Sequence, residues 1–152
     1  MLSKQSLRDI LLFCLVLAVS LGVFYLLDGL LALEKPVVYL FNMLGFVNVN
    51  GTSLVDNTIV LINYECSGFF SIFVYLALIF SPISKLGLRR RFISFFVGAI
   101  ILYLANILRL LLLFRLWPVF GIEFMHIFGW FLMSAIIFGL WYWFSYKQQF
   151  SH

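Results

Sequence analysis

Three side chains that could do chemistry stand in or beside segments that are otherwise apolar: Cys66, Arg109 and His126. A thiol is a good nucleophile as the thiolate, and a neighbouring cation or a helix N-terminus favours that charged form. An imidazole can take the thiol proton or give one to a leaving amine, while a guanidinium can hold a developing oxyanion or a substrate carbonyl. If the fold brings the three together, they predict acyl transfer.

Small and polar neighbours support this set. Asn106 lies three residues before Arg109, so the two share a helical face and the amide can orient the guanidinium. Gly68 follows Cys66 and Ser67 and permits close approach of the backbone. Gly129 does the same in the last apolar segment. Ser67 and Gly68 therefore join Asn106 as supporting residues, with ordinary small-residue packing as the alternative for both glycines.

The cysteines also have a simpler interpretation. A single cysteine in a membrane segment is most often a small apolar packing residue, and we assign Cys14 that structural role. Glu65 precedes Cys66 directly, and a carboxylate beside a thiol disfavours the thiolate unless the acid points to solvent. The two cysteines form no CxxC or Cys/His pattern, so no disulfide framework and no metal site is predicted.

The remaining charged residues of the apolar segments have open roles. Arg115 lies on a different face from Arg109 and is expected to reach the outer interface, an alternative that also applies to Arg109 alone and to His126. Three roles are open for Asp28: an ion pair with Arg109, an ion pair with Arg115, or simply the end of the first span. What favours a site is that Cys66, Arg109 and His126 fall at one depth.

The elements that carry these residues must be membrane helices. The chain of 152 residues is 64% hydrophobic and 11% charged, and its mean hydropathy is +1.12. A water-soluble domain of this size could not cover such a composition with polar surface. The formal charge of +4 reflects topology and does not imply a nucleic-acid partner.

We predict an all-α membrane protein, a bundle of about four transmembrane helices forming a single domain over residues 1–152. Helices are expected because they satisfy their own backbone hydrogen bonds in lipid. The predicted spans are residues 10–33, 67–84, 92–116 and 124–146. Residues 117–123, with Pro118 and Gly121, are expected to break the chain between the last two spans.

The basic residues predict the orientation of the spans. Placing the N-terminus and residues 85–91 in the cytoplasm leaves seven basic residues outside the spans on that side and one, Lys35, on the other. Basic residues concentrate on the cytoplasmic side of membrane proteins, so both termini are predicted to be cytoplasmic. The seven are Lys4, Arg8, Lys85, Arg89, Arg90, Arg91 and Lys147.

The long outer loop, residues 34–66, has recognisable parts. Residues 36–46 predict a short helix at the membrane interface. Residues 47–62 predict a small hairpin that leads into Cys66, with the turn dipeptide Asn50-Gly51 inside it. Asn50-Gly51-Thr52 also reads as a glycosylation sequon, a motif that is common by chance.

The depth of the site follows from helix geometry. At a rise of 1.5 Å per residue, Arg109 lies about 25 Å along the third span from Phe92, which is close to the outer surface of a core about 30 Å thick. Cys66 and His126 begin the second and fourth spans from that same side. A thiol, a guanidinium and an imidazole therefore occupy one layer near the outer leaflet.

Short ordered motifs extend the argument. The segment Glu65-Cys66-Ser67-Gly68 opens a span, Asn106-Ile107-Leu108-Arg109 lies in the next, and His126 begins the one after. This pattern resembles the exosortase/archaeosortase family of membrane-embedded cysteine transpeptidases and proteases. The resemblance covers roughly residues 59–130 and suggests a short, minimal member, since larger members have additional helices.

The resemblance implies a defined activity. Family members recognise proteins with a C-terminal sorting signal, made of a short motif, a transmembrane helix and a basic cluster, and cleave at the motif outside the cytoplasm. By motif, Cys66 would form the acyl-enzyme, Arg109 would stabilise the tetrahedral intermediate or position the substrate, and His126 would act as general acid/base. A lipid amine, a glycan amine or water would accept the acyl group, and no metal or organic cofactor is required.

A hypothesis from another class stands beside this one. The chain could be a non-catalytic helical membrane partner, a subunit of an export or surface-polymer assembly system in which polar residues only join helices. A channel or transporter fits less well, because the inner halves of the spans offer almost no polar residues to line a path.

Overall fold

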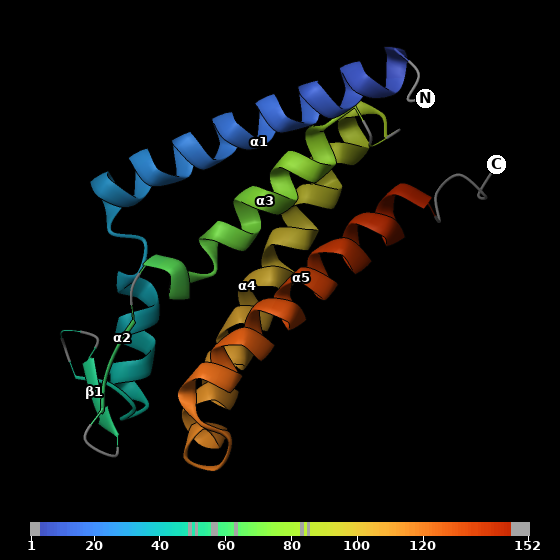
Figure 1. Cartoon of the computed structure of the whole chain (residues 1–152). Coiled ribbons are helices and arrows are strands. Elements are labelled where there is room, and N and C mark those ends of the chain that lie inside the picture. The colour runs from blue at the N-terminus through green and yellow to red at the C-terminus, as the bar shows by residue number, and fades with distance from the viewer. Residues whose placement is uncertain are drawn as a thin grey trace.

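The computed structural model describes residues 4–48, 50, 52–55, 58–62, 64–82, 84 and 86–146 of the chain. Four helices dominate it (Figure 1): α1 (Lys4–Leu31), α3 (Phe69–Phe80), α4 (Leu88–Phe120) and α5 (Ile122–Tyr146). Within α1, and in α4 and α5, apolar runs are long enough to cross a membrane, whereas α3 is a shorter apolar helix. The predicted all-α membrane bundle is confirmed.

Helix α3 is the central element of the bundle. It contacts α1 on one side and both α4 and α5 on the other, and α4 and α5 also pack on each other. Figure 1 shows α1 lying across α3, away from the α4–α5 pair. The beginning of α1, the end of α5 and the connection between α3 and α4 lie at one end of the molecule, as the predicted orientation requires.

A small subdomain occupies the other end. It consists of the short helix α2 (Lys35–Met43) and an antiparallel hairpin of β1 (Thr52–Val55) and β2 (Thr58–Leu61). The register pairs Val55 with Thr58, so the strands are joined between these two residues and not at Asn50-Gly51, which precedes the hairpin. The Asn48 side chain explains the difference, because its Oδ1 accepts hydrogen bonds from the backbone N–H groups of Asn50 and Thr52 at 3.0 and 3.1 Å.

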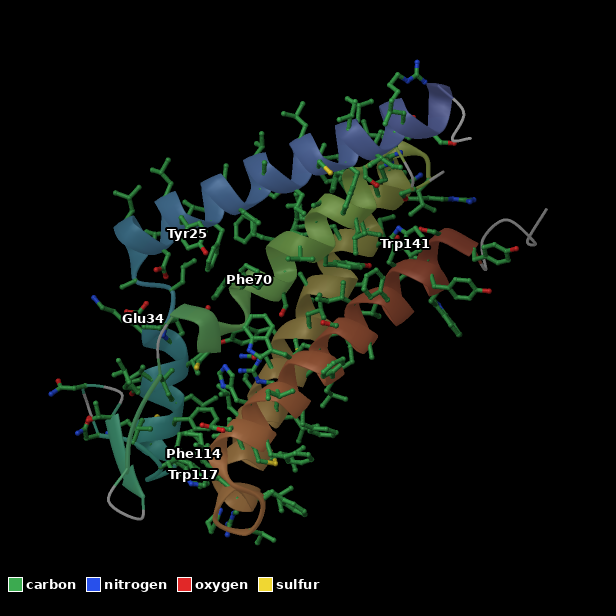
Figure 2. All side chains as sticks on the ribbon, viewed as in Figure 1. Tyr25, Glu34, Phe70, Phe114, Trp117 and Trp141 are labelled. Carbon is green, nitrogen blue, oxygen red and sulfur yellow. The ribbon has the colours of Figure 1, made fainter. Side chains whose placement is uncertain are left out.

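Two principal apolar clusters hold these parts together. The inner cluster joins α3, α4 and α5 and contains Tyr75, Leu78, Ile79, Leu86, Leu102, Met133 and Ile137. The outer cluster joins α2 and the hairpin region to α4 and contains Val37, Phe41, Val47, Ile62 and Leu110. Figure 2 shows Phe114, which packs against the outer cluster, at the α2 end of the molecule, far from Trp141.

The C-terminal end of α3 is closed by a side chain of α4. Arg91 donates from Nη1 to the carbonyl of Phe80 at 2.8 Å, from Nη2 to that of Ser84 at 2.6 Å and from Nε to that of Leu86 at 2.9 Å. The hydroxyl of Ser81 adds a bond to the carbonyl of Leu78 at 2.9 Å. Carbonyls at a helix end have no partner within the helix, so Arg91 binds the end of α3 and the following loop to the start of α4.

Close packing in the middle of α3 fixes its position along α4. The Tyr75 side chain is fully buried, and its hydroxyl donates to the carbonyl of Ser94 at 3.2 Å. The Tyr75 ring lies directly against Gly98, where the Cβ of any other residue would overlap it. A tyrosine therefore fits between α3 and α4 because α4 has a glycine at this point.

Helix α4 ends within residues 117–123, the segment that was expected to break the chain. The helix continues through Pro118 to Phe120, since Pro118 removes one backbone donor without ending the helix. The break occurs at Gly121, whose φ of 81° and ψ of 152° are essentially restricted to glycine. Helix α5 begins at the next residue, which makes the connection between the last two helices very short.

We expect Arg91→Gln to lower the free energy of unfolding in detergent micelles by roughly 2–4 kcal/mol, because it leaves carbonyls of Phe80, Ser84 and Leu86 without their charged donor. Thermal or denaturant unfolding of the purified protein measures the change. Arg90→Gln is the matched control, since Arg90 is exposed and its substitution should leave the free energy of unfolding almost unchanged. Equal effects of the two substitutions would contradict this account of α3.

Candidate functional site

Cys66 lies in a short 3-10 helix, η1 (Tyr64–Ser67), just before α3. Gly68 separates the two elements with a φ of 81° and a ψ of −11°, a left-handed conformation that favours glycine. Ser67 is fully buried, and its Oγ accepts a hydrogen bond from the backbone N–H of Phe69 at 3.3 Å at the start of α3. The change of direction at Gly68 places η1, hereafter the thiol segment, across the N-terminal end of α3.

Asn106 of α4 anchors this segment. Its Nδ2 donates to the backbone carbonyl of Cys66 at 2.7 Å, across a separation of forty residues. The side chain is fully buried, and a Cβ placed on Gly68 would lie 2.8 Å from its atoms. The absence of a side chain at Gly68 thus allows Asn106 to reach Cys66, which gives both predicted supporting residues a physical role.

Arg109 lies beside the same segment. Arg109 is 6% exposed and lies within electrostatic range of Cys66. The Cys66 side chain is half-buried and packs against the outer apolar cluster. Figure 2 shows nitrogen-bearing side chains gathered where the thiol segment faces α4 and α5. The structure therefore brings Cys66, Asn106 and Arg109 together.

His126 lies in the first turns of α5. One turn later, Gly129 is buried against Arg109, and a Cβ there would lie 3.0 Å from Arg109 Cδ. The imidazole Nε2 accepts a hydrogen bond from the indole Nε1–H of Trp130 at 3.0 Å. The histidine is thus held on the α5 face that packs near the guanidinium. The sequence argument missed Trp130, although its four-residue spacing from His126 is a readable helical signal.

Two buried polar atoms next to Cys66 have no hydrogen-bond partner among the described residues. They are Oδ1 of Asn106 and Nε of Arg109, an acceptor and a donor one helical turn apart. The amide assignment of Asn106 follows from its bond to Cys66, because a carbonyl oxygen can pair only with the NH2 end. Buried polar atoms are normally satisfied, so this pair is available to a bound group.

The other candidates lie apart from this cluster. Among the described residues Asp28 forms no ion pair with Arg109 or Arg115, and one of its carboxylate oxygens is buried without a hydrogen-bond partner. Arg115 is exposed, and so is Cys14, which forms no disulfide with Cys66. The side chain of Glu65 lies outside the described part of the structure. The described residues contain no group of three or more metal-ligating side chains.

We expect Gly68→Ala to be more destabilising than Gly45→Ala. Both glycines have positive φ values, 81° and 75°, so both substitutions carry the left-handed penalty of about 1–2 kcal/mol. Only Gly68 would also contact Asn106, since nothing lies within 4 Å of a Cβ at Gly45. The additional loss of unfolding free energy is roughly 1–3 kcal/mol, the cost of a displaced buried hydrogen bond. Unfolding of both variants in detergent measures it, and equal losses for the two would contradict the packing described.

We expect Asn106→Leu to change the accessibility of Cys66, because the anchored carbonyl loses its donor. Alkylation of Cys66 in Cys14→Ala protein measures the effect, with an expected rate change of several-fold. Asn42→Leu is the matched control, since it removes the same type of bond, from Nδ2 to the carbonyl of Val47 at 2.9 Å, in α2. An Asn106→Leu protein with unchanged alkylation would show that the anchor does not position the thiol.

Comparison with known proteins identifies a family. A family model described as transmembrane exosortase matches residues 2–142, which include α1, α3, α4, most of α5 and the residues Cys66, Asn106, Arg109 and His126. No curated protein and no solved structure matches the chain. Because the match covers well over half of the sequence, the chain belongs to the transmembrane exosortase family.

Proposed function

We propose that this exosortase-family membrane protein is a cysteine transpeptidase or protease that cleaves C-terminal sorting signals of exported proteins through an acyl-enzyme on Cys66. The observation that carries the proposal is the anchoring of the Cys66 segment to α4, beside the buried Arg109. Burying a cation in a membrane costs free energy, so such residues usually have a function, and Arg109 lies beside the proposed nucleophile Cys66. The substrate is a membrane-anchored protein that reaches the site within the lipid bilayer.

The proposed reaction follows acyl-transfer chemistry. His126 takes the proton of the Cys66 thiol, and the sulfur attacks the scissile carbonyl carbon, forming an S–C bond and a tetrahedral oxyanion. Arg109 stabilises that oxyanion, and its Nε has no hydrogen-bond partner among the described residues. His126 gives a proton to the leaving amine as the C–N bond breaks. An amine acceptor or water then attacks the thioester, and the thiol is released.

The unpartnered pair on α4 supports recognition of a peptide. A peptide unit offers one N–H donor and one C=O acceptor. Asn106 Oδ1 could accept from such an N–H, while Arg109 Nε could donate to the carbonyl. Both atoms lie in protein interior, so a substrate backbone that satisfies them gains more than it would from water-exposed groups.

The topology supports a site that faces the extracytoplasmic side. The end of the molecule that carries the start of α1, the end of α5 and the basic start of α4 is the proposed cytoplasmic end. The helix α2 and the hairpin then lie outside. We propose a multi-pass cell-membrane protein with both termini in the cytoplasm.

Substitution of the three reactive residues tests the proposal. We expect Cys66→Ala to abolish processing of a co-expressed substrate that ends in a short motif, an apolar span and a basic cluster. Arg109→Gln and His126→Asn should each reduce processing by about 100-fold or more, the usual loss for an oxyanion donor or a general acid/base. A mobility shift of the substrate in isolated membranes is the measurement.

Cys14→Ala and Arg115→Gln are the matched controls, because both residues are exposed and lie apart from the cluster. Processing should continue in these variants. If all three site variants retained processing in membranes that contain the folded protein, the enzyme assignment would be wrong. Loss of stability without any change in processing would instead favour a non-catalytic partner subunit.

A further inference from the structure

The hydrogen bond between Trp130 and His126 has a chemical consequence for the imidazole. An indole N–H can only donate, so the Nε2 of His126 must accept with its lone pair. A neutral imidazole with a lone pair on Nε2 carries its proton on Nδ1. The imidazolium form has N–H groups at both positions and cannot keep this bond.

The indole is itself held by packing from another helix. The Trp130 ring meets Phe70 of α3 in a T-shaped contact, with ring centroids 5.7 Å apart and an interplanar angle of 76°. Phe70 in turn contacts the fully buried Phe24 of α1 at 6.0 Å. Figure 2 shows Phe70 near the N-terminal end of α3, just after the segment that carries the thiol. The position of the donor is therefore set by three helices.

We propose that Trp130 is a positioning residue that holds His126 as the neutral imidazole with its proton on Nδ1. Among the described residues, Arg109 of α4 lies against Gly129, one turn after His126, and Glu123 lies one turn before His126 on α5.

With one proton already on Nδ1, His126 takes up a second proton in a separate step. The only lone pair that can receive a proton is on Nε2, so protonation replaces the hydrogen bond from Trp130 by an N–H. The imidazolium that results carries the proton required by a leaving amine. This catalytic part rests on the function proposed above, whereas the tautomer of His126 does not.

Nitrogen NMR of His126 tests the proposal in the full-length protein. The sequence has two histidines, so His152→Gln with 15N-histidine labelling leaves His126 as the only reporter. We expect an unprotonated Nε2 and a protonated Nδ1 at pH 7 to 8 in detergent micelles. Trp130→Phe keeps an aromatic ring and removes the donor, so the tautomer ratio should shift towards Nε2–H by roughly fivefold to tenfold, the usual worth of one hydrogen bond.

Trp141→Phe is the matched control. Trp141 lies on the same helix, and its indole Nε1 is buried without a hydrogen-bond partner among the described residues, so this substitution removes an indole N–H but none of the described hydrogen bonds. The His126 spectrum should stay unchanged. A protonated Nε2 in the parent protein, or the same tautomer ratio in Trp130→Phe and parent, would overturn the proposal.

A second measurement covers a Trp130→Phe protein that fails to fold. In the parent protein, the indole N–H signal of Trp130 should move when His126 becomes protonated at low pH, while that of Trp141 should not. An unmoved Trp130 signal would overturn the proposal. Neither readout needs a substrate, so failure of the sorting-signal assay with a correct tautomer would count against the proposed function alone.

Discussion

The bond from Asn106 to the carbonyl of Cys66 is the constraint on which the site depends. The chain must leave helical geometry at Gly68 to turn the thiol segment across α3, and the carbonyl of Cys66 then lacks a helical partner. In an apolar surrounding such a carbonyl needs a donor. A buried amide on α4 supplies it, and the same helix face carries Arg109. The geometry of the Cys66 segment and the placement of the Arg109 cation thus both depend on α4.

The site lies between two apolar clusters that differ in what they hold. The inner cluster packs α3 against α4 and α5, while the outer one packs α2 and the hairpin region against α4, and Cys66 touches the outer one. Aromatic rings connect the site to α1, which contacts the bundle mainly through α3. The reactive groups lie on η1, α4 and α5, and α4 contributes both Asn106 and Arg109.

Periodicity and hydropathy are properties of single segments, and they predicted what depends on single segments: the apolar helices, and the shared face of Asn106 and Arg109. They failed where one segment binds the backbone of another. The sequence predicts Arg91 only as a topological charge, because two of its carbonyl partners, Ser84 and Leu86, belong to a loop whose path no pattern reveals. Turn propensity is local and pointed to Asn50-Gly51, whereas in the structure Val55 pairs with Thr58 and the Asn48 side chain binds the backbone just before the first strand.

The brevity of α3 determines how the protein enters the bilayer. Twelve residues span about 18 Å, well below the thickness of the hydrocarbon core, so α3 cannot stand alone as a membrane span. Arg91 donates to the carbonyl of Phe80 at the C-terminal end of α3, and Asn106 donates to the carbonyl of Cys66 just before its N-terminal end. Both residues belong to α4, which is translated after α3. During biosynthesis α3 must therefore wait for α4, and the two helices are expected to insert together as a hairpin, with the nucleophile segment taking its final position last.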